Sequence, residues 1–155
     1  MMIPENTFKA LKAISERLNG KGINWVLIGS TNHALQGVDV KPRNIDILTD
    51  KDGAYAIGEA LKEYIIEEVH PRETENMKSH YGRFSIEDVE VEIIGDLINI
   101  KPEGDLWSET DNFSKKIIIE FKNVEVPGIS LDQEYVAYKK LGKMEKAEKI
   151  KEAMN

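Results

Sequence analysis

Residues 25–50 constrain the fold of this chain more than any other stretch. A continuously apolar run ends at Gly29-Ser30, a short segment of helical character follows, and a second apolar run then carries Asn44 and Asp46. Ser30 and Asp46 lie 16 positions apart (46 − 30), which is enough for a two-turn helix and a returning strand. The pattern therefore predicts that both residues meet at one edge of a β-sheet.

Asn44 and Asp46 occupy alternate positions of the second strand, which is predicted over residues 44–49. Because side chains alternate between the faces of a strand, these two share a face, whereas Ile45 and Ile47 point into a core. Oxygen-bearing side chains on one face form half of a site for a hard cation such as Mg²⁺, which keeps positions open for water and substrate phosphates. This face is the first candidate metal site.

The Gly29-Ser30 turn has the features of a phosphate-binding turn. Gly29 lets the backbone turn sharply and come close to a ligand. Ser30 can cap the following helix, predicted over residues 31–36, whose N-terminal amides and dipole favour a phosphate. A Gly-Ser strand end also occurs in many α/β domains without such a site. The interpretation of this turn as a phosphate site is strengthened by the second strand, which carries Asn44 and Asp46.

A third candidate ligand lies on residues 89–94, where apolar and acidic residues alternate. This alternation predicts a strand with Glu90 and Glu92 on one face and valine and isoleucine on the other. Taken alone, the two glutamates are more typical of a solvated sheet face.

Together these segments resemble the signature of the nucleotidyltransferase superfamily that includes DNA polymerase beta. That signature is an apolar strand ending in Gly-Gly or Gly-Ser, a helical turn, and Asp-x-Asp or Asp-x-Glu on the next strand, with a third acid on a later strand. Within it, the chain looks most like the small, stand-alone bacterial and archaeal members. The resemblance implies a nucleotidyltransferase fold: a mixed, twisted sheet flanked by helices, with a helical tail at the C-terminus.

The resemblance also implies a metal-dependent reaction. Asn44, Asp46 and Glu92 would be the metal-binding and catalytic residues, holding Mg²⁺ or Mn²⁺, with Glu92 as metal ligand or general base. The substrate would be a nucleoside triphosphate and the by-product pyrophosphate. Gly29 and Ser30 would hold the triphosphate.

Two groups of cations are candidates for contacting its phosphates. Lys41 and Arg43 lie close to the entry of the second strand, where they can reach phosphate oxygens or stay exposed to solvent. Lys139 and Lys140 lie on the C-terminal helix, and in related transferases a lysine of a comparable helix touches the nucleotide phosphates. Arg43 and Lys140 therefore complete the predicted nucleotide-binding set.

The chain departs from this signature at Asn44, which stands where the family has its first aspartate. An amide oxygen can ligate Mg²⁺ but carries no formal charge, so one of three negative charges is missing. The sequence leaves open a variant with altered metal use, a protein that binds without turnover, and a deliberately inactivated chain. Asp39 is an alternative source of the missing charge.

Length, composition and charge limit the classes of protein to which this chain can belong. The 155 residues, 41% of them apolar, predict one domain over residues 1–155, with a core at about 5–126 and C-terminal helices at about 130–154. The net charge of −7 disfavours bulk wrapping of nucleic acid. There is no cysteine, hence no disulfide or thiolate site. No apolar run reaches the roughly 18 residues that span a bilayer, so we expect a cytoplasmic protein without a membrane partner.

The rest of the chain reads as an α/β alternation. Helices are predicted over about 5–19, after a cap at Asp50 or Asp52, and over 131–141 and 145–154; strands are predicted over 23–29, 65–69, 81–86, 116–121 and 123–126. The polar segment 70–79 is predicted to be an irregular, mobile loop. Trp107 and Phe113 lie in a polar stretch and would either anchor a loop or stack on a base. His33 is expected to be a packed or surface residue.

The predicted activity is therefore transfer of a nucleoside monophosphate from a triphosphate to a hydroxyl of a small molecule, an RNA or a protein. The alternative is a catalytically silent member that binds nucleotide, or a partner protein, through the same cleft. Asn44 keeps this alternative open. The sequence leaves the oligomeric state open as well.

Overall fold

A computed structural model describes residues 3–75, 77–99 and 116–155. Within these residues the chain forms one seven-stranded sheet, five α-helices and a short 3₁₀ helix. In order, the elements are α1 (Glu5–Leu18), β1 (Trp25–Ile28), α2 (Gly29–Leu35), β2 (Ile45–Thr49), α3 (Lys51–Ala60), η1 (Lys62–Tyr64), β3 (Ile65–Glu73), β4 (Met77–Ile86), β5 (Val89–Asn99), β6 (Lys116–Phe121), β7 (Val124–Ile129), α4 (Leu131–Lys140) and α5 (Met144–Met154).

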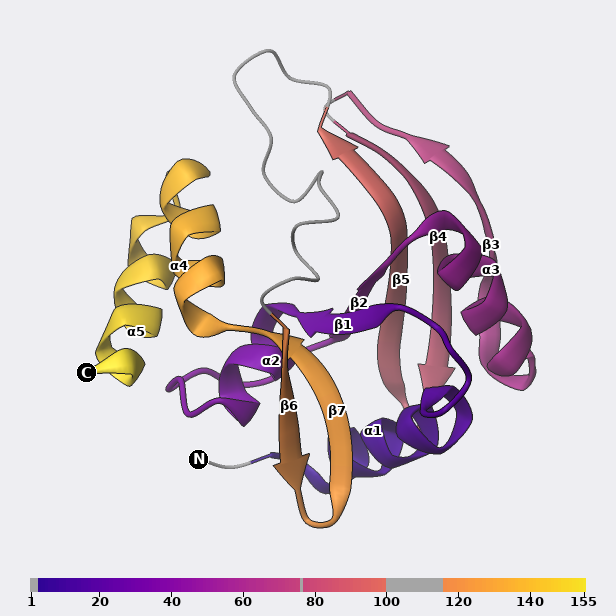
Figure 1. The fold of residues 1–155 in the computed structure, drawn as a ribbon, viewed down its shortest axis with the longest axis horizontal. Helices are drawn as coiled ribbons and strands as arrows, with labels where there is room; N and C mark the ends of the chain where they lie inside the picture. Colours follow the sequence, from indigo (N-terminus) through magenta and orange to yellow (C-terminus); the bar gives the residue numbers. More distant parts are fainter. Residues whose placement is uncertain (1–2, 76, 100–115) are drawn as a thin grey trace.

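The sheet is mixed, with strand order β3-β4-β5-β2-β1-β7-β6. β1 pairs antiparallel with β2 and parallel with β7, and β2 pairs parallel with β5. The β3-β4, β4-β5 and β6-β7 pairs are antiparallel. The two parallel pairs lie in the inner part of the sheet, and β2 is flanked by β5 on one side and β1 on the other (Figure 1).

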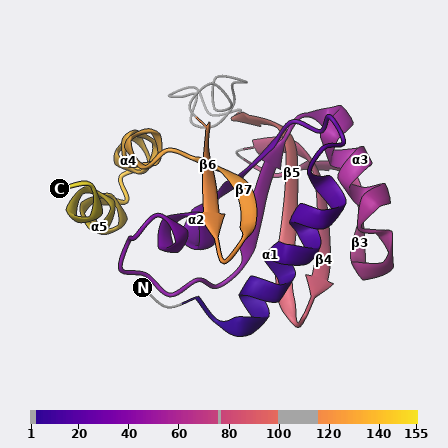
Figure 2. The same cartoon turned by 60° about the horizontal axis from the view of Figure 1, so that its bottom comes forward.

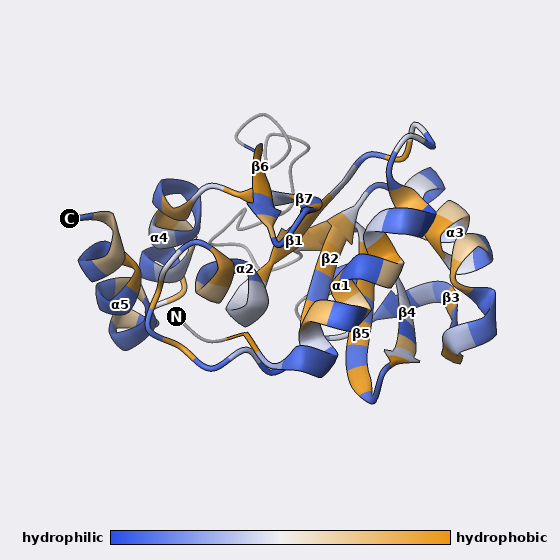
Figure 3. Ribbon diagram, turned by 90° about the horizontal axis from the view of Figure 1, so that it is seen from below, coloured by the Kyte–Doolittle hydropathy of each residue, from blue (hydrophilic) through white to orange (hydrophobic). Residues whose placement is uncertain are grey.

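The main core lies between this sheet and the helices α1 and α3. The apolar stripe of α1, with Leu11, Ile14 and Leu18, belongs to the same buried cluster as Ile45 and Ile47 of β2. α1 runs across one face of the sheet in Figure 2, and in Figure 3 its outer surface is hydrophilic. The expected alternation along β2, with both isoleucines in the core, is confirmed.

The helices α4 and α5 pack on each other at one side of the molecule, away from α3 and β3 (Figure 1). They have a small apolar cluster of their own, formed by Tyr138, Ala147 and Ile150 together with Val38 from the segment between α2 and β2. This cluster is separate from the main core. It anchors the helical pair on the segment that follows α2.

Tight turns join the two predicted hairpins, and both hairpins are confirmed. Glu87 and Asp88 connect β4 to β5 with φ angles of 54° and 63°, and Lys122 and Asn123 connect β6 to β7 with φ angles of 50° and 68°. Two successive positive φ angles characterise the two-residue turn whose twist matches antiparallel strands. The C-terminal helical tail is confirmed too.

Most of the segment 70–79, predicted to be a loop, forms β-strands. β3 continues to Glu73 and β4 begins at Met77, so most of the expected loop is a hairpin extension, and the prediction of an irregular loop is wrong. β3 is an edge strand, exposed along much of both faces, and therefore lacks the apolar alternation that marks buried strands. Trp107 and Phe113 lie outside the described residues.

Asp50 caps α3, as the sequence indicates. Its side chain accepts a hydrogen bond from the backbone N–H of Gly53 at 2.6 Å. None of the described helices combines the length and the apolar character required to cross a bilayer.

Candidate active site

The ends of three strands bring the predicted acidic residues together. Ile28, the last residue of β1, pairs with Asp46 of β2, and Asp46 pairs in turn with Glu92 of the parallel strand β5. Residues directly opposite each other in neighbouring strands place their side chains on the same face of the sheet. Asp46 and Glu92 are therefore adjacent, and the turn at Gly29 lies beside them.

Gly29 is the point at which the backbone comes closest to Asp46. Its φ angle is +80°, and a Cβ atom built on it would lie 2.6 Å from Oδ2 of Asp46. Only glycine adopts this conformation without strain and leaves room for the carboxylate. The end of β1, predicted to approach a ligand, therefore lies against the Asp46 carboxylate, and Gly29 and Asp46 line one cavity.

The Asp46 carboxyl is held in an unfavourable environment for a charge. Burial, then the charge of Glu92 and a hydrogen bond shared with it, raise the pKa of Asp46 from 3.8 to about 7. Oδ1 of Asp46 is buried and has no hydrogen-bond partner. A bound cation would relieve both the repulsion and the unpaired oxygen, so the acidic pair fits a divalent metal ion.

Glu92 receives one hydrogen bond from a neighbouring strand. The Tyr81 hydroxyl on β4 donates to Oε1 of Glu92 at 3.1 Å. Burial and the negative charge of Glu92 raise the pKa of Tyr81 to about 12, so the phenol keeps its proton at neutral pH. The phenol therefore acts as a hydrogen-bond donor that holds the Glu92 side chain from one side.

Asn44 lies immediately before β2 and lines the same cavity as Asp46. Its backbone carbonyl accepts a hydrogen bond from the Thr31 hydroxyl at 2.7 Å, which ties the entry of β2 to α2. Across the described parts of the chain, no three acidic, histidine or cysteine side chains form a metal-binding group. Among the described residues, the candidate metal ligands are therefore the carboxylates of Asp46 and Glu92 and the neutral amide of Asn44.

Ser30 has a different local role from the predicted helix cap. α2 begins at Gly29, its N-cap residue is Ile28, and the Ser30 hydroxyl accepts a hydrogen bond from the backbone N–H of Arg43 at 3.0 Å. The capping prediction is wrong because the helix starts one residue before Ser30. The hydroxyl instead fixes the segment that leads into β2 against α2.

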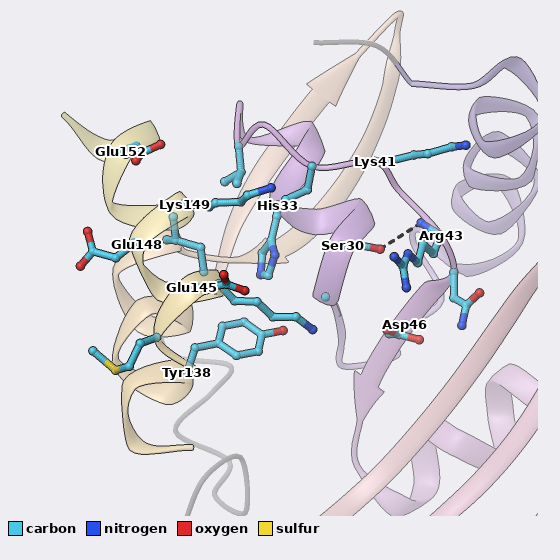
Figure 4. A pocket seen from close by; sticks show the side chains of 17 residues that line it. Ser30, His33, Lys41, Arg43, Asp46, Tyr138, Glu145, Glu148, Lys149 and Glu152 are labelled. Carbon is cyan, nitrogen blue, oxygen red and sulfur yellow. Dashed lines mark hydrogen bonds between the residues drawn. The ribbon is translucent and has the colours of Figure 1, made fainter. Parts of the chain in front are cut away.

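A cavity of about 950 Å³ opens in front of these residues. Figure 4 shows Ser30, Arg43 and Asp46 on one side, with Tyr138 of α4 and Glu145 and Lys149 of α5 on the other. Its lining comprises Gly29, Ser30, His33, Val38, Val40, Lys41, Arg43, Asn44, Asp46, Tyr138, Met144, Glu145, Lys146, Glu148, Lys149, Ile150 and Glu152.

The structure gathers most, but not all, of the predicted site residues. Gly29, Ser30, Arg43, Asn44 and Asp46 line the cavity, and Glu92 joins them through its pairing with Asp46. Lys140 is exposed at the end of α4 and does not line it, nor does Asp39. The lysines that α4 and α5 place on the cavity are Lys146 and Lys149. Which of the two C-terminal helices directs its lysines at the cavity could not be predicted from so lysine-rich a sequence.

Comparisons with known proteins agree with this geometry. The model of the aminoglycoside-2''-adenylyltransferase family matches residues 10–154. The chain belongs to this family. The crystal structure of a Thermotoga maritima protein described as a nucleotidyltransferase matches with a TM-score of 0.84 and 38% identity, over 99% of this chain and 96% of that chain. Among curated proteins, none matches the chain. The nucleotidyltransferase fold expected from the sequence is therefore confirmed.

This adenylyltransferase-family chain also has a buried polar network that the sequence did not predict. Glu134 of α4 is fully buried, pairs with the His33 ring of α2, and accepts a hydrogen bond from Asn32 Nδ2 at 3.1 Å. Gln36 adds a bond to Asn32 Oδ1 at 2.8 Å and one to the Ile129 carbonyl at 2.8 Å. The network ties α4 to α2 behind the cavity wall. In the sequence, Glu134 looks like any acid in the first turn of a helix.

His33 itself lies between this network and the cavity. Its ring is 5% exposed, lines the cavity, and meets the Tyr138 ring edge-on with 5.5 Å between centroids. The expectation of a packed histidine agrees with this placement.

Proposed function

We propose that this chain transfers a nucleoside monophosphate from a nucleoside triphosphate to a hydroxyl group, with Mg²⁺ or Mn²⁺, and releases pyrophosphate. The observation that carries the proposal is the adjacent pair Asp46 and Glu92, held beside the Gly29 turn with a buried, unpartnered carboxylate oxygen facing a cavity. Membership of an adenylyltransferase family supports the same chemistry.

Asp46 and Glu92 would hold the divalent ion, with the Asn44 amide as a neutral third ligand. When bound, such an ion neutralises phosphate charge and lowers the pKa of a coordinated hydroxyl. Asp46 would be ionised in that state, because the cation offsets both its burial and the repulsion from Glu92.

The transfer itself then uses few protein groups. The acceptor oxygen forms a bond to the α-phosphorus, the bond from that phosphorus to the oxygen bridging to the β-phosphate breaks, and pyrophosphate leaves. The hydroxyl proton passes to the acidic pair, for which Glu92 is the acceptor we assign. Catalysis of this kind rests on positioning and on charge stabilisation.

The triphosphate would lie along the Gly29-Ser30 turn. Glycine permits close approach of the backbone, and Arg43, fixed by its backbone bond to Ser30, lies next to the same space. Lys41, Lys146 and Lys149 add positive charge around the cavity. These cations suit a polyanionic substrate although the chain carries a net charge of −7.

For the acceptor we propose a hydroxyl of a small cationic molecule, of which an aminoglycoside is an example. The family description names such an acceptor. Three glutamates of α5, Glu145, Glu148 and Glu152, line the wall formed by the C-terminal helices, so the cavity also has a region suited to ammonium groups. RNA and protein hydroxyls are the competing acceptors.

Asn44 supports a second candidate, a member that binds nucleotide or a partner protein without turnover. With one charge fewer than the family signature, the site would bind a metal–nucleotide complex and fail to activate the acceptor.

Two measurements on one protein separate these candidates. Thermal unfolding with each nucleoside triphosphate, with and without Mg²⁺ or Mn²⁺, measures binding, because a ligand of the folded state raises stability by about 2.7 kcal/mol at 100 times its Kd. Incubation with α-labelled triphosphate and an aminoglycoside, RNA or protein acceptor measures transfer and pyrophosphate release.

We expect metal-dependent stabilisation together with label transfer to the aminoglycoside, both lost in Asp46→Asn. Stabilisation without transfer to any acceptor would favour the silent binder. Transfer that survives in Asp46→Asn would contradict the proposed site.

A further inference from the structure

The hairpin of β4 and β5 brings the Tyr81 side chain next to Glu92. Tyr81 of β4 pairs with Ile94 of β5, so Glu92, two residues earlier on β5, is its diagonal neighbour. Diagonal neighbours of an antiparallel pair are within reach of an aromatic side chain. The Tyr81 hydroxyl donates to Oε1 of Glu92 at 3.1 Å across this diagonal.

The Tyr81 ring has little freedom to move away from this position. It is 8% exposed, and the Arg72 guanidinium of β3 lies over its face, with Cζ 4.2 Å from the ring centroid. A cation over an aromatic face is attracted by the electrons of the ring. Burial of the ring and its contact with Arg72 thus fix the position of the Tyr81 hydroxyl.

Arg83, the other side chain that could bind Glu92, forms its hydrogen bonds with different glutamates. Arg83 lies directly opposite Glu92 in the β4-β5 register, yet its guanidinium donates to Glu67 at 3.2 Å and to Glu90 at 2.9 Å. A guanidinium on Glu92 would neutralise the carboxylate and compete with a metal ion. A phenol orients the carboxylate and leaves its negative charge available.

From these contacts we propose that Tyr81 is a positioning residue that aims Glu92 at the metal site beside Asp46. This inference rests on the proposed function, since it assigns a role to the same acidic pair. Its importance follows from Asn44: since the described residues bring two carboxylates to the site, the orientation of Glu92 determines whether both can reach one cation.

Tyr81→Phe tests this inference. Phenylalanine keeps the buried ring and the surface that faces Arg72, and removes only the hydroxyl that reaches Glu92. The matched control is Tyr55→Phe, which also removes one phenol in contact with a side chain, since the Tyr55 hydroxyl lies 2.9 Å from His80 Nδ1. The probe is Mn²⁺ with a non-hydrolysable triphosphate analogue, titrated by calorimetry and by the electron paramagnetic resonance signal of free Mn²⁺.

We expect Tyr81→Phe to weaken Mn²⁺ binding by roughly tenfold, the lower end of what loss of a ligand-orienting contact costs. Tyr55→Phe should bind Mn²⁺ as the unmodified chain does. In an active enzyme, the label-transfer assay should show a lower kcat at saturating Mn²⁺ with a nucleotide KM that changes less. Melting temperatures of both variants report whether the fold is kept.

A double-mutant cycle separates positioning through Glu92 from a general effect on the sheet. In a Glu92→Gln background, adding Tyr81→Phe should cause no further loss of Mn²⁺ affinity. An equal further loss, or Mn²⁺ affinity unchanged in Tyr81→Phe, would overturn the positioning role while leaving the proposed function in place. Absence of Mn²⁺ binding by the unmodified chain would overturn both.

Discussion

Asp46 and Glu92 lie directly opposite each other on the parallel strands β2 and β5, and share a hydrogen bond between their carboxyl groups. Two carboxylates this close cannot both ionise at low cost in a half-buried site. The pair therefore links the stability of the chain to pH.

We expect the metal-free protein to lose stability as the pH rises from about 4 to about 7. The pKa of Asp46 is about 7 in the folded chain, against an ordinary value of 3.8, so the folded state binds more protons across this window. Fewer protons are bound by the unfolded state, and the free energy of unfolding consequently falls with pH, then levels off. Asp46→Asn should remove this contribution and raise stability at pH 8 by up to about 4 kcal/mol.

Urea denaturation in chelator at pH 5, 6.5 and 8 measures this dependence. Asp39→Asn, which removes an exposed carboxylate outside the cavity lining, is the control. Parallel pH profiles for the unmodified chain and Asp46→Asn would show that Asp46 does not experience the repulsion.

Gly29→Ala should destabilise the chain and disturb the site together. The substitution places a methyl group in a left-handed conformation, at about 1 to 2 kcal/mol, and drives it against Oδ2 of Asp46. Gly20→Ala is the matched control, because Gly20 has a nearly identical φ of +78° and no atom within 4 Å of the added Cβ. Thermal melts with and without Mn²⁺-nucleotide should show greater destabilisation and a lost ligand response for Gly29→Ala alone. Identical behaviour of the two variants would mean that the contact with Asp46 is unimportant.

Asn44→Asp should strengthen divalent-ion binding by about tenfold, equivalent to ~1.4 kcal/mol, because it restores a charged ligand beside Asp46. The same change should lower the stability of the metal-free chain, since a third carboxylate joins the pair. Calorimetric titration with Mn²⁺ measures the first effect, and Asn155→Asp at the exposed C-terminus serves as control. Unaltered affinity would place residue 44 outside the metal site.

Glu134→Ala should cost about 3 to 5 kcal/mol, because it leaves the buried His33 ring without its Glu134 partner and removes one of the two acceptors of the Asn32 amide. Glu134→Gln keeps an oxygen that can accept from Asn32 and should cost less. Urea denaturation provides both values. A loss below about 1 kcal/mol for Glu134→Ala would show that the network does not hold α4 in place.

Lys146→Ala and Lys149→Ala should each weaken triphosphate binding more than Lys140→Ala, because the first two lysines line the cavity and Lys140 does not. The loss should diminish at higher salt as electrostatic attraction is screened. Calorimetry with a non-hydrolysable analogue at two ionic strengths is the measurement. Greater weakening by Lys140→Ala would reverse the assignment and support the residue expected from sequence.

The strands around the site could be predicted because each leaves a periodic trace. β2 and β5 alternate apolar and polar residues, and the Glu87-Asp88 turn separates two such runs, so the strands that carry Asp46 and Glu92 follow from local patterns. Residues 70–73 of β3 carry no such trace. On an edge strand, polar side chains on both faces cost little, so the chain pairs without apolar alternation.

Contacts between elements far apart in sequence could not be predicted. Glu134 is buried because α4 packs against α2. Tyr81 reaches Glu92 because the two residues are diagonal neighbours on adjacent strands. The spacing of residues in the sequence predicts neither contact. Ser30 lies at the predicted turn but has a different partner, because α2 begins two residues earlier than the sequence predicts. Single sequences specify which elements form more firmly than which side chains meet.

The apolar cluster shared by Val38 with α4 and α5 has a consequence for how members of this family can diversify. The helical pair rests on the segment between α2 and β2 rather than on the main core, so changes in the length or bulk of that segment would widen or narrow the cavity. The acidic strands would keep their register throughout. Substrate range and reaction chemistry can therefore evolve as separate modules in this architecture.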